Sequence, residues 1–132
     1  MTRLADALLL VAVVFAGCTQ STLVVPGAVD PRANLQLYLD AVVAGNCDAA
    51  RAMTTASFTV GNGDLCGITR ITAYSIADQP ARPNANEVVY AATITTAGGD
   101  ASMPDGSHMW FYTLTRLATN GEWRISGGGT GP

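Results

Sequence analysis

Charge is scarce in this chain, and lysine is missing altogether. Charged residues make up 13% of the 132 residues, and the seven basic residues, all arginines, are outnumbered by ten acidic ones. With a net charge of -3 at pH 7, the chain offers no basic surface that could neutralise a phosphate backbone. We therefore expect no nucleic-acid partner.

The chain also lacks the common motifs of metal binding and catalysis. Its one histidine and three cysteines show no CxxC or HxxxH spacing, so we expect no metal site. No GxSxG nucleophile elbow occurs, and the C-terminal SGGGTGP has neither the lysine nor the following helix of a phosphate loop. We expect no cofactor, and we assign no catalytic residue.

The longest apolar run is too short to cross a membrane. It covers residues 7–16, after Arg3, whereas a transmembrane helix needs about 20 apolar residues. A basic start, an apolar run and small residues at its end are the three parts of a secretory signal. We expect residues 1–17 to be a cleavable signal peptide.

The end of this signal reads Phe15-Ala16-Gly17-Cys18 and resembles the lipobox of bacterial lipoproteins, with Phe15 in place of the usual leucine. The resemblance implies that Cys18 is acylated and becomes the mature N-terminus. Several acyl chains anchor a protein stably, here to the extracytoplasmic face of the cell membrane. Residues 18–30 would then be a lipidated tether. The alternative is an ordinary signal peptide that leaves Cys18 as a free thiol.

The odd number of cysteines favours the lipid, because an exported protein with an unpaired thiol needs an explanation. If Cys18 carries lipid, Cys47 and Cys66 remain as a pair. We expect them to form a disulfide, whose loop of about 20 residues would stabilise the fold by roughly 3 kcal/mol in the chain-entropy model. Two separate buried thiols are the alternative.

Two helices are expected at the start of the folded part. Asp30 followed by proline is a typical helix start, and apolar residues then recur at spacings of three and four. Gly45 is a typical left-handed helix end. Asn46 predicts the N-cap of a second helix, from residue 47 to about residue 57. The glycine-rich residues 61–67 are expected to be a loop.

After this loop, the apolar pattern changes to alternation. Four segments rich in Ile, Val, Thr and aromatic residues predict antiparallel strands at residues 68–78, 87–97, 109–118 and 122–127. Asn120-Gly121 predicts a two-residue hairpin turn between the last two strands. Residues 31–127 should therefore form an α+β domain, with two helices packed on a curled four-stranded antiparallel sheet. Residues 128–132 would be a flexible, glycine-rich tail.

Two stretches resemble a known fold family. YLDAVVAGNCDAARAMTTASF, residues 38–58, is similar to the opening helices of the nuclear-transport-factor-2-like (SnoaL-like, cystatin-like) cone fold. MWFYTLTRLATNGEWRISG, residues 109–127, is similar to its closing hairpin. The whole chain resembles small secreted lipoproteins of actinobacteria with that fold. The resemblance implies a cone-like domain but no particular reaction, because the fold carries many activities.

The aromatic residues are the candidates for a ligand pocket. We expect Tyr38, Trp110, Tyr112 and Trp123 to meet between the helices and the sheet. There they either pack the core or, with His108, line an apolar pocket at the open end of the cone. His108, Trp110 and Tyr112 should share one strand face. A binding module would need a cavity of about 300 Å³ or more.

The charged side chains are expected to lie at the surface. Arg70, Arg116 and Arg124 should point outward and pair with acids, and anion binding is the alternative. Asp64 belongs to the glycine-rich loop, and no acid of the chain is flanked by apolar strand positions. We therefore expect no carboxylate inside a cavity.

These observations predict a membrane-anchored binding or interaction module, whose partner is a small apolar ligand or an envelope protein. One alternative is a small isomerase or dehydratase that uses His108 as its acid or base, next to a tyrosine in the cavity. Another is an envelope assembly or stress factor that acts by protein contacts. Edge strands could serve such contacts by pairing with a strand of the partner.

Overall fold

The computed structural model describes residues 30–119 and 121–132, which contain two α-helices and then four strands. The expected signal peptide, Cys18 and the tether up to residue 29 lie outside the described residues, as does Asn120. Within these described ranges, no helix is long and apolar enough to span a membrane. The elements are α1 (Pro31–Val43), α2 (Cys47–Arg51), the 3-10 helix η1 (Val60–Asn62), β1 (Arg70–Ile76), β2 (Glu87–Ala97), β3 (Gly106–Arg116) and β4 (Trp123–Gly129).

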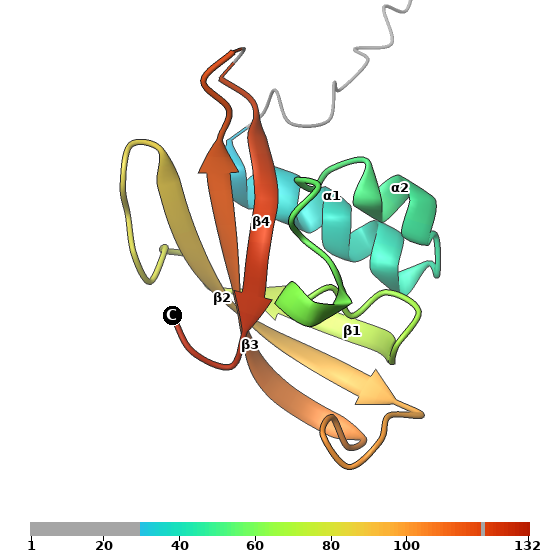
Figure 1. Cartoon of the computed structure of the whole chain (residues 1–132). Coiled ribbons are helices and arrows are strands. Elements are labelled where there is room, and N and C mark those ends of the chain that lie inside the picture. Colours follow the sequence, from blue (N-terminus) through green and yellow to red (C-terminus); the bar gives the residue numbers. More distant parts are fainter. Residues whose placement is uncertain (1–29, 120) are drawn as a thin grey trace, which may run out of the picture.

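The four strands form one antiparallel sheet in the order β1-β2-β3-β4 (Figure 1). Tyr90 of β2 lies opposite Tyr112 of β3, and Leu114 of β3 lies opposite Ile125 of β4. β2 and β3 have 11 residues each and curve along their length (Figure 1). The α+β class, the two helices and the four-stranded antiparallel sheet are therefore confirmed.

Helix α1 starts and ends as its sequence predicts. The Asp30 carboxylate accepts a hydrogen bond from the Ala33 N–H at 3.1 Å, and Gly45 has a φ of 73°, which favours glycine just beyond the helix end. α1 contacts β1, β3 and β4, while α2 packs against α1 on the same side of the sheet (Figure 1). The buried face of α1 consists of Asn34, Leu35, Tyr38, Leu39 and Val42.

Helix α2 is shorter than predicted. The side chain of Asn46 caps it as expected, but the helix ends at Arg51, well before the predicted end. Ile125 of β4 then donates its N–H to the Met53 carbonyl at 3.1 Å and accepts from the Thr55 N–H at 2.8 Å. Pairing with the sheet thus replaces the helical hydrogen bonds. Such tertiary contacts override local helix propensity.

The strand boundaries agree with the prediction for β2 and differ for the other three strands. β1 is shorter than residues 68–78, and β3 begins earlier than residue 109, at Gly106. β4 continues to Gly129, so Gly128 and Gly129, which we expected in a flexible tail, belong to the sheet. The lack of a side chain on Gly128 lets β4 approach its neighbours, since a Cβ there would lie 2.8 Å from Trp110 Nε1 and 3.2 Å from the Gly63 oxygen.

The predicted two-residue turn between β3 and β4 is wrong. β3 ends at Arg116 and β4 begins only at Trp123. The Leu117 N–H donates to the Glu122 carbonyl at 2.7 Å, which places the loop between these two residues. Gly121 has the positive φ, 70°, that the dipeptide predicted. The hairpin loop is thus longer than its sequence signal indicated.

The helices and the sheet share one hydrophobic core, with tyrosines at its centre. The Tyr38 ring contacts the rings of Phe58 and Tyr112 edge to face, with centroids 5.8 Å apart in both pairs. Ala50, Met53 and Phe58, in and after α2, are also buried in this core. Residues 61–67 form a loop whose start is the short helix η1.

Candidate functional site

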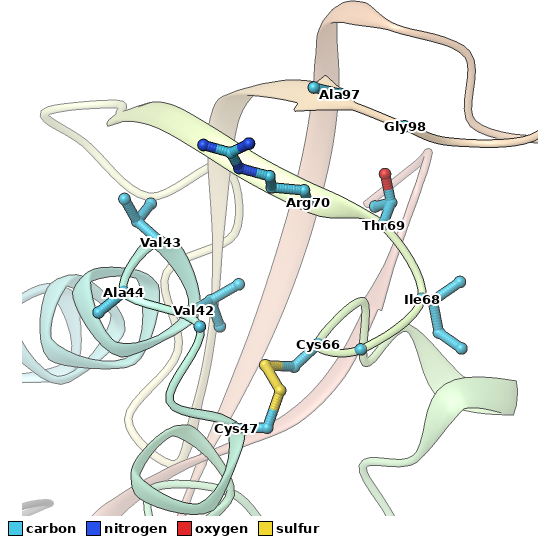
Figure 2. Close-up of a pocket in the computed structure, with 12 residues that line it drawn as sticks. Val42, Val43, Ala44, Cys47, Cys66, Ile68, Thr69, Arg70, Ala97 and Gly98 are labelled. Atoms are coloured by element: carbon cyan, nitrogen blue, oxygen red, sulfur yellow. A yellow bond between two sulfur atoms is a disulfide. The ribbon is translucent and has the colours of Figure 1, made fainter.

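The Cys47–Cys66 disulfide forms the floor of an open groove of about 710 Å³ (Figure 2). The turn at the end of α1, residues 42–45, lines one side, and residues 66–70 line the other. Ala97 and Gly98, at the end of β2, complete it. We call this hollow the disulfide groove.

A second hollow, of about 330 Å³, lies next to the first, and Ile68 and Thr69 line both. It contains the side chain of Trp110 from β3, and we call it the Trp110 cavity. Both volumes lie within the range of small-molecule sites. The other residues that line the Trp110 cavity are Val60, Asp64, Leu65, Asp100, Ser102, Met103 and Thr130.

The disulfide ties the first residue of α2 to the glycine-rich loop, which forms part of both hollows. Cys47 and Cys66 are joined with an S–S distance of 2.05 Å and are 19 residues apart in the sequence. The predicted pairing is therefore present. The two segments lie far apart along the chain, so the crosslink fixes the shape of the groove between them.

Asp64 is buried in this loop and lines the Trp110 cavity, which corrects our expectation of no carboxylate inside a cavity. Its side chain is 2% exposed and accepts hydrogen bonds from Arg51 Nε at 3.1 Å and from the Cys66 N–H at 2.9 Å. Tyr38 donates a longer bond of 3.4 Å. The hydrogen bond from the Cys66 N–H, two residues further along the chain, closes a turn that aspartate commonly makes in loops. An aspartate in this loop was therefore the sequence signal for the turn. Asp64 thus fastens the loop to both helices.

The core tyrosines keep their protons at neutral pH. Burial raises the pKa of Tyr38 well above its ordinary value, and the nearby Tyr112 hydroxyl and Asp64 carboxylate raise it further. Burial likewise raises the pKa of Tyr112, with Asp64 as the second cause. Neither hydroxyl can act as a base under these conditions, so both belong to the packing of the core.

The five residues predicted for a ligand pocket do not form one site. Tyr38 and Tyr112 are completely buried, and Trp123 pairs with Arg116, the last residue of β3, six residues beyond Trp110. Trp110 lines the Trp110 cavity. Tyr112 and Trp110 share the buried face of β3, which is the expected alternation.

His108 lies near the start of β3 and has a structural partner. Its Nε2–H donates to the Pro104 carbonyl at 2.6 Å, which ties the strand to the loop before it. The ring is partly exposed. This contact gives no support to an acid–base role, because the ring nitrogen is engaged with a backbone group.

Two polar atoms at the Trp110 cavity are buried without a partner in the described part of the chain. They are Trp110 Nε1 and Thr69 Oγ1, on residues that are 9% and 8% exposed. A buried donor left unsatisfied costs about 1–3 kcal/mol. Trp110 Nε1 lies close to Gly128 of β4 and Thr69 Oγ1 lies close to Gly99, so both atoms belong to the packing behind the cavity wall.

Sequence reasoning missed most of the residues that surround these hollows. Ile68, Thr69 and Arg70 were assigned to a strand, yet they meet the end of α1 and the end of β2 in space. Trp110 was named because aromatic residues were expected to meet between the helices and the sheet. Among residues 30–119 and 121–132, no group of three His, Cys, Asp or Glu side chains is arranged to hold a metal ion.

Comparisons with known proteins add no assignment. No protein-family model matches the chain, no curated protein matches it, and no solved structure matches it. The geometry of the described residues is therefore the basis for assigning a function.

Proposed function

We propose that this protein is a lipid-anchored, extracytoplasmic binding module that holds a small, largely apolar ligand in the disulfide groove and the Trp110 cavity. The observation that carries the proposal is where the exposed apolar side chains gather. Of the four large hydrophobic side chains exposed on the described residues, Val43, Val60 and Ile68 line these two hollows. The fourth, Met109, lines neither.

Ile68 is the central residue of this surface. It is 55% exposed and lines both hollows, with Val43 on the groove side and Val60 on the cavity side. Exposed apolar side chains that occur singly need no explanation, but a cluster around a hollow marks a binding site. Burial of this surface by a ligand would be favourable at roughly 25 cal/mol per Å².

The proposed anchor is the acylated Cys18, supported by the signal-like residues 1–17 and the lipobox-like sequence before the cysteine. From there to Asp30 the tether has about 12 residues and reaches at most ~40 Å. The binding site would thus stay near the membrane, where apolar molecules concentrate. We also propose the nuclear-transport-factor-2-like cone fold, which is supported by two helices preceding a sheet with long, curved strands (Figure 1).

A fluorescence titration tests the binding function. We would use the full chain with Cys18→Ser, which removes the acylation site, and N-phenyl-1-naphthylamine, an uncharged apolar dye that brightens when it leaves water. We expect the dye to bind, and Ile68→Asp to weaken binding at least about 10-fold, because it places a charge on the apolar surface.

The matched control is Met109→Asp. Met109 is also 55% exposed, but it lines neither hollow. This variant should bind the dye as the parent chain does. Absence of dye binding to the parent chain, or equal losses in the two variants, would contradict the proposed site.

A further inference from the structure

Arg70 differs from the other arginines in having no partner among the described residues. Six of the seven arginines lie in the described part of the chain, and the other five donate to carbonyl or carboxylate oxygens. Arg70 makes no hydrogen bond or ion pair there, and its side chain is exposed. Its guanidinium group is thus free to bind a ligand anion.

Arg70 lies in the wall of the disulfide groove. Among the described residues that line the disulfide groove, Arg70 is the charged one, and the rest are apolar residues, glycines, half-cystines and Thr69. In Figure 2, its guanidinium extends toward the side of Val43, whereas Ile68 lies on the opposite side of the groove. Apolar side chains thus line both sides, and the cation among the described groove residues lies away from Ile68.

The neighbouring Trp110 cavity carries a negative charge. Asp100 lines the Trp110 cavity, and hydrogen bonds from the Ser102 side chain and backbone hold its pKa below the usual value, so it is ionised at neutral pH. An anionic group would be repelled there and attracted to Arg70, which favours one orientation of a ligand with one charged end.

We propose that the disulfide groove binds a single-chain amphiphile with a carboxylate head, that is, a free long-chain fatty acid. The planar fork of Arg70 matches the two oxygens of a carboxylate, and the chain lies over the disulfide toward Ile68. This assignment rests on the proposed binding function and names its ligand class. The single cation among the described groove residues favours one head group over a bilayer surface, which the net charge of -3 disfavours.

The test compares an acid with its own ester. The full chain with Cys18→Ser is titrated with cis-parinaric acid, a fluorescent long-chain carboxylate, and with its methyl ester, which has the same chain and no charge. Arg70→Gln removes the proposed head-group contact. Arg82→Gln is the control, because Arg82 donates to the Pro132 carbonyl and does not line the groove.

We expect the acid to bind about 5-fold more tightly than the ester in the parent chain and in Arg82→Gln. In Arg70→Gln the two ligands should bind equally, and high salt should reduce the difference in the parent chain. Equal affinities for acid and ester in the parent chain, or an unchanged difference between them in Arg70→Gln, would overturn this inference. If the dye and the ester still bind, the proposed binding function is retained.

Two further outcomes are distinguishable. If neither the acid, nor the ester, nor the uncharged dye binds, the proposed function fails together with the inference. If the chain ignores the acid but sediments with phosphatidylglycerol vesicles in an Arg70-dependent manner, the occupant is an anionic membrane surface, and the fatty-acid assignment is wrong.

Discussion

Arg51 of α2 and Asp64 of the glycine-rich loop form an ion pair with Nε and Oδ2 3.1 Å apart, in which the carboxylate is 2% exposed. The Cys47–Cys66 disulfide joins the same two segments. The loop that shapes both hollows is therefore held twice, once covalently and once by charge. Its position decides the geometry of the binding surface.

Asp64→Asn tests the ion pair. The amide still accepts hydrogen bonds but no longer neutralises Arg51, whose side chain is 48% exposed and can be solvated. We expect a loss of about 1.5 kcal/mol in the free energy of unfolding, measured by urea denaturation. Asp78→Asn is the control, because this carboxylate is 99% exposed and lies 3.8 Å from Arg32. Equal effects of both variants would show that burial of Asp64 does not matter.

Removal of the disulfide should lower stability more strongly. Cys47 and Cys66 are 19 residues apart, and the chain-entropy model gives about 3 kcal/mol for a loop of this size. We expect a double alanine variant to unfold at a lower urea concentration than the parent, and a reductant to shift the parent in the same way. If the urea midpoint of the parent chain does not change although its disulfide is fully reduced, the disulfide has no stabilising role.

Gly128 is the position where β4 passes closest to Trp110. A Cβ added there would lie 2.8 Å from Trp110 Nε1 and 3.2 Å from the Gly63 carbonyl oxygen. We expect Gly128→Ala to destabilise the fold by about 1–3 kcal/mol and to change the tryptophan fluorescence spectrum. Gly129→Ala should do neither, since no atom lies within 4 Å of its added Cβ. An unchanged spectrum in Gly128→Ala would contradict this packing.

The tyrosines predict a loss of stability in alkali. Burial and the Tyr74–Asp40 hydrogen bond of 2.5 Å raise the pKa of Tyr74 to about 12, and burial raises the pKa values of Tyr38 and Tyr112 further. Unfolded tyrosines titrate near pH 10. The contribution of these tyrosines to the free energy of unfolding is therefore complete below about pH 10. It is lost as the pH rises through their pKa values in the folded chain.

Urea denaturation at a series of pH values measures this effect. The midpoint should fall above about pH 10, and Tyr74→Phe should reduce the fall between about pH 10 and pH 12. The ultraviolet absorbance of tyrosinate should appear later in the folded chain than in urea. Simultaneous titration of folded and unfolded chains would show that the tyrosines are not protected.

Local sequence signals predicted those parts of the fold that depend on local chemistry. Asp30 and Asn46 cap helices through hydrogen bonds to residues three positions on, and β2 has the predicted bounds. The end of α2 at Arg51 could not be predicted in this way, because Ile125 draws the following residues into the sheet. The length of the β3–β4 loop was also missed, because β3 ends at Arg116, several residues before the Asn120-Gly121 dipeptide that predicted a tight turn.

The candidate site was less predictable than the fold. Trp110 was named as one of the aromatic residues expected between the helices and the sheet, but the disulfide groove is built from three separate segments, residues 42–45, 66–70 and 97–98, together with Cys47. Asp64 was assigned to a glycine-rich loop, and the composition of that loop does not indicate that the carboxylate is buried. Its burial results from the disulfide and from Arg51, and neither contact leaves a local pattern.

The central claim is that a lipid on one cysteine holds a ligand-binding domain at the membrane. Native mass spectrometry of the full-length protein, extracted in mild detergent from the membranes of cells that export it, measures both parts together. We predict a mature chain that begins at Cys18, carries covalent acyl groups, and releases a non-covalent apolar ligand that is missing from Ile68→Asp. An unacylated polypeptide mass with no bound small molecule would contradict the account.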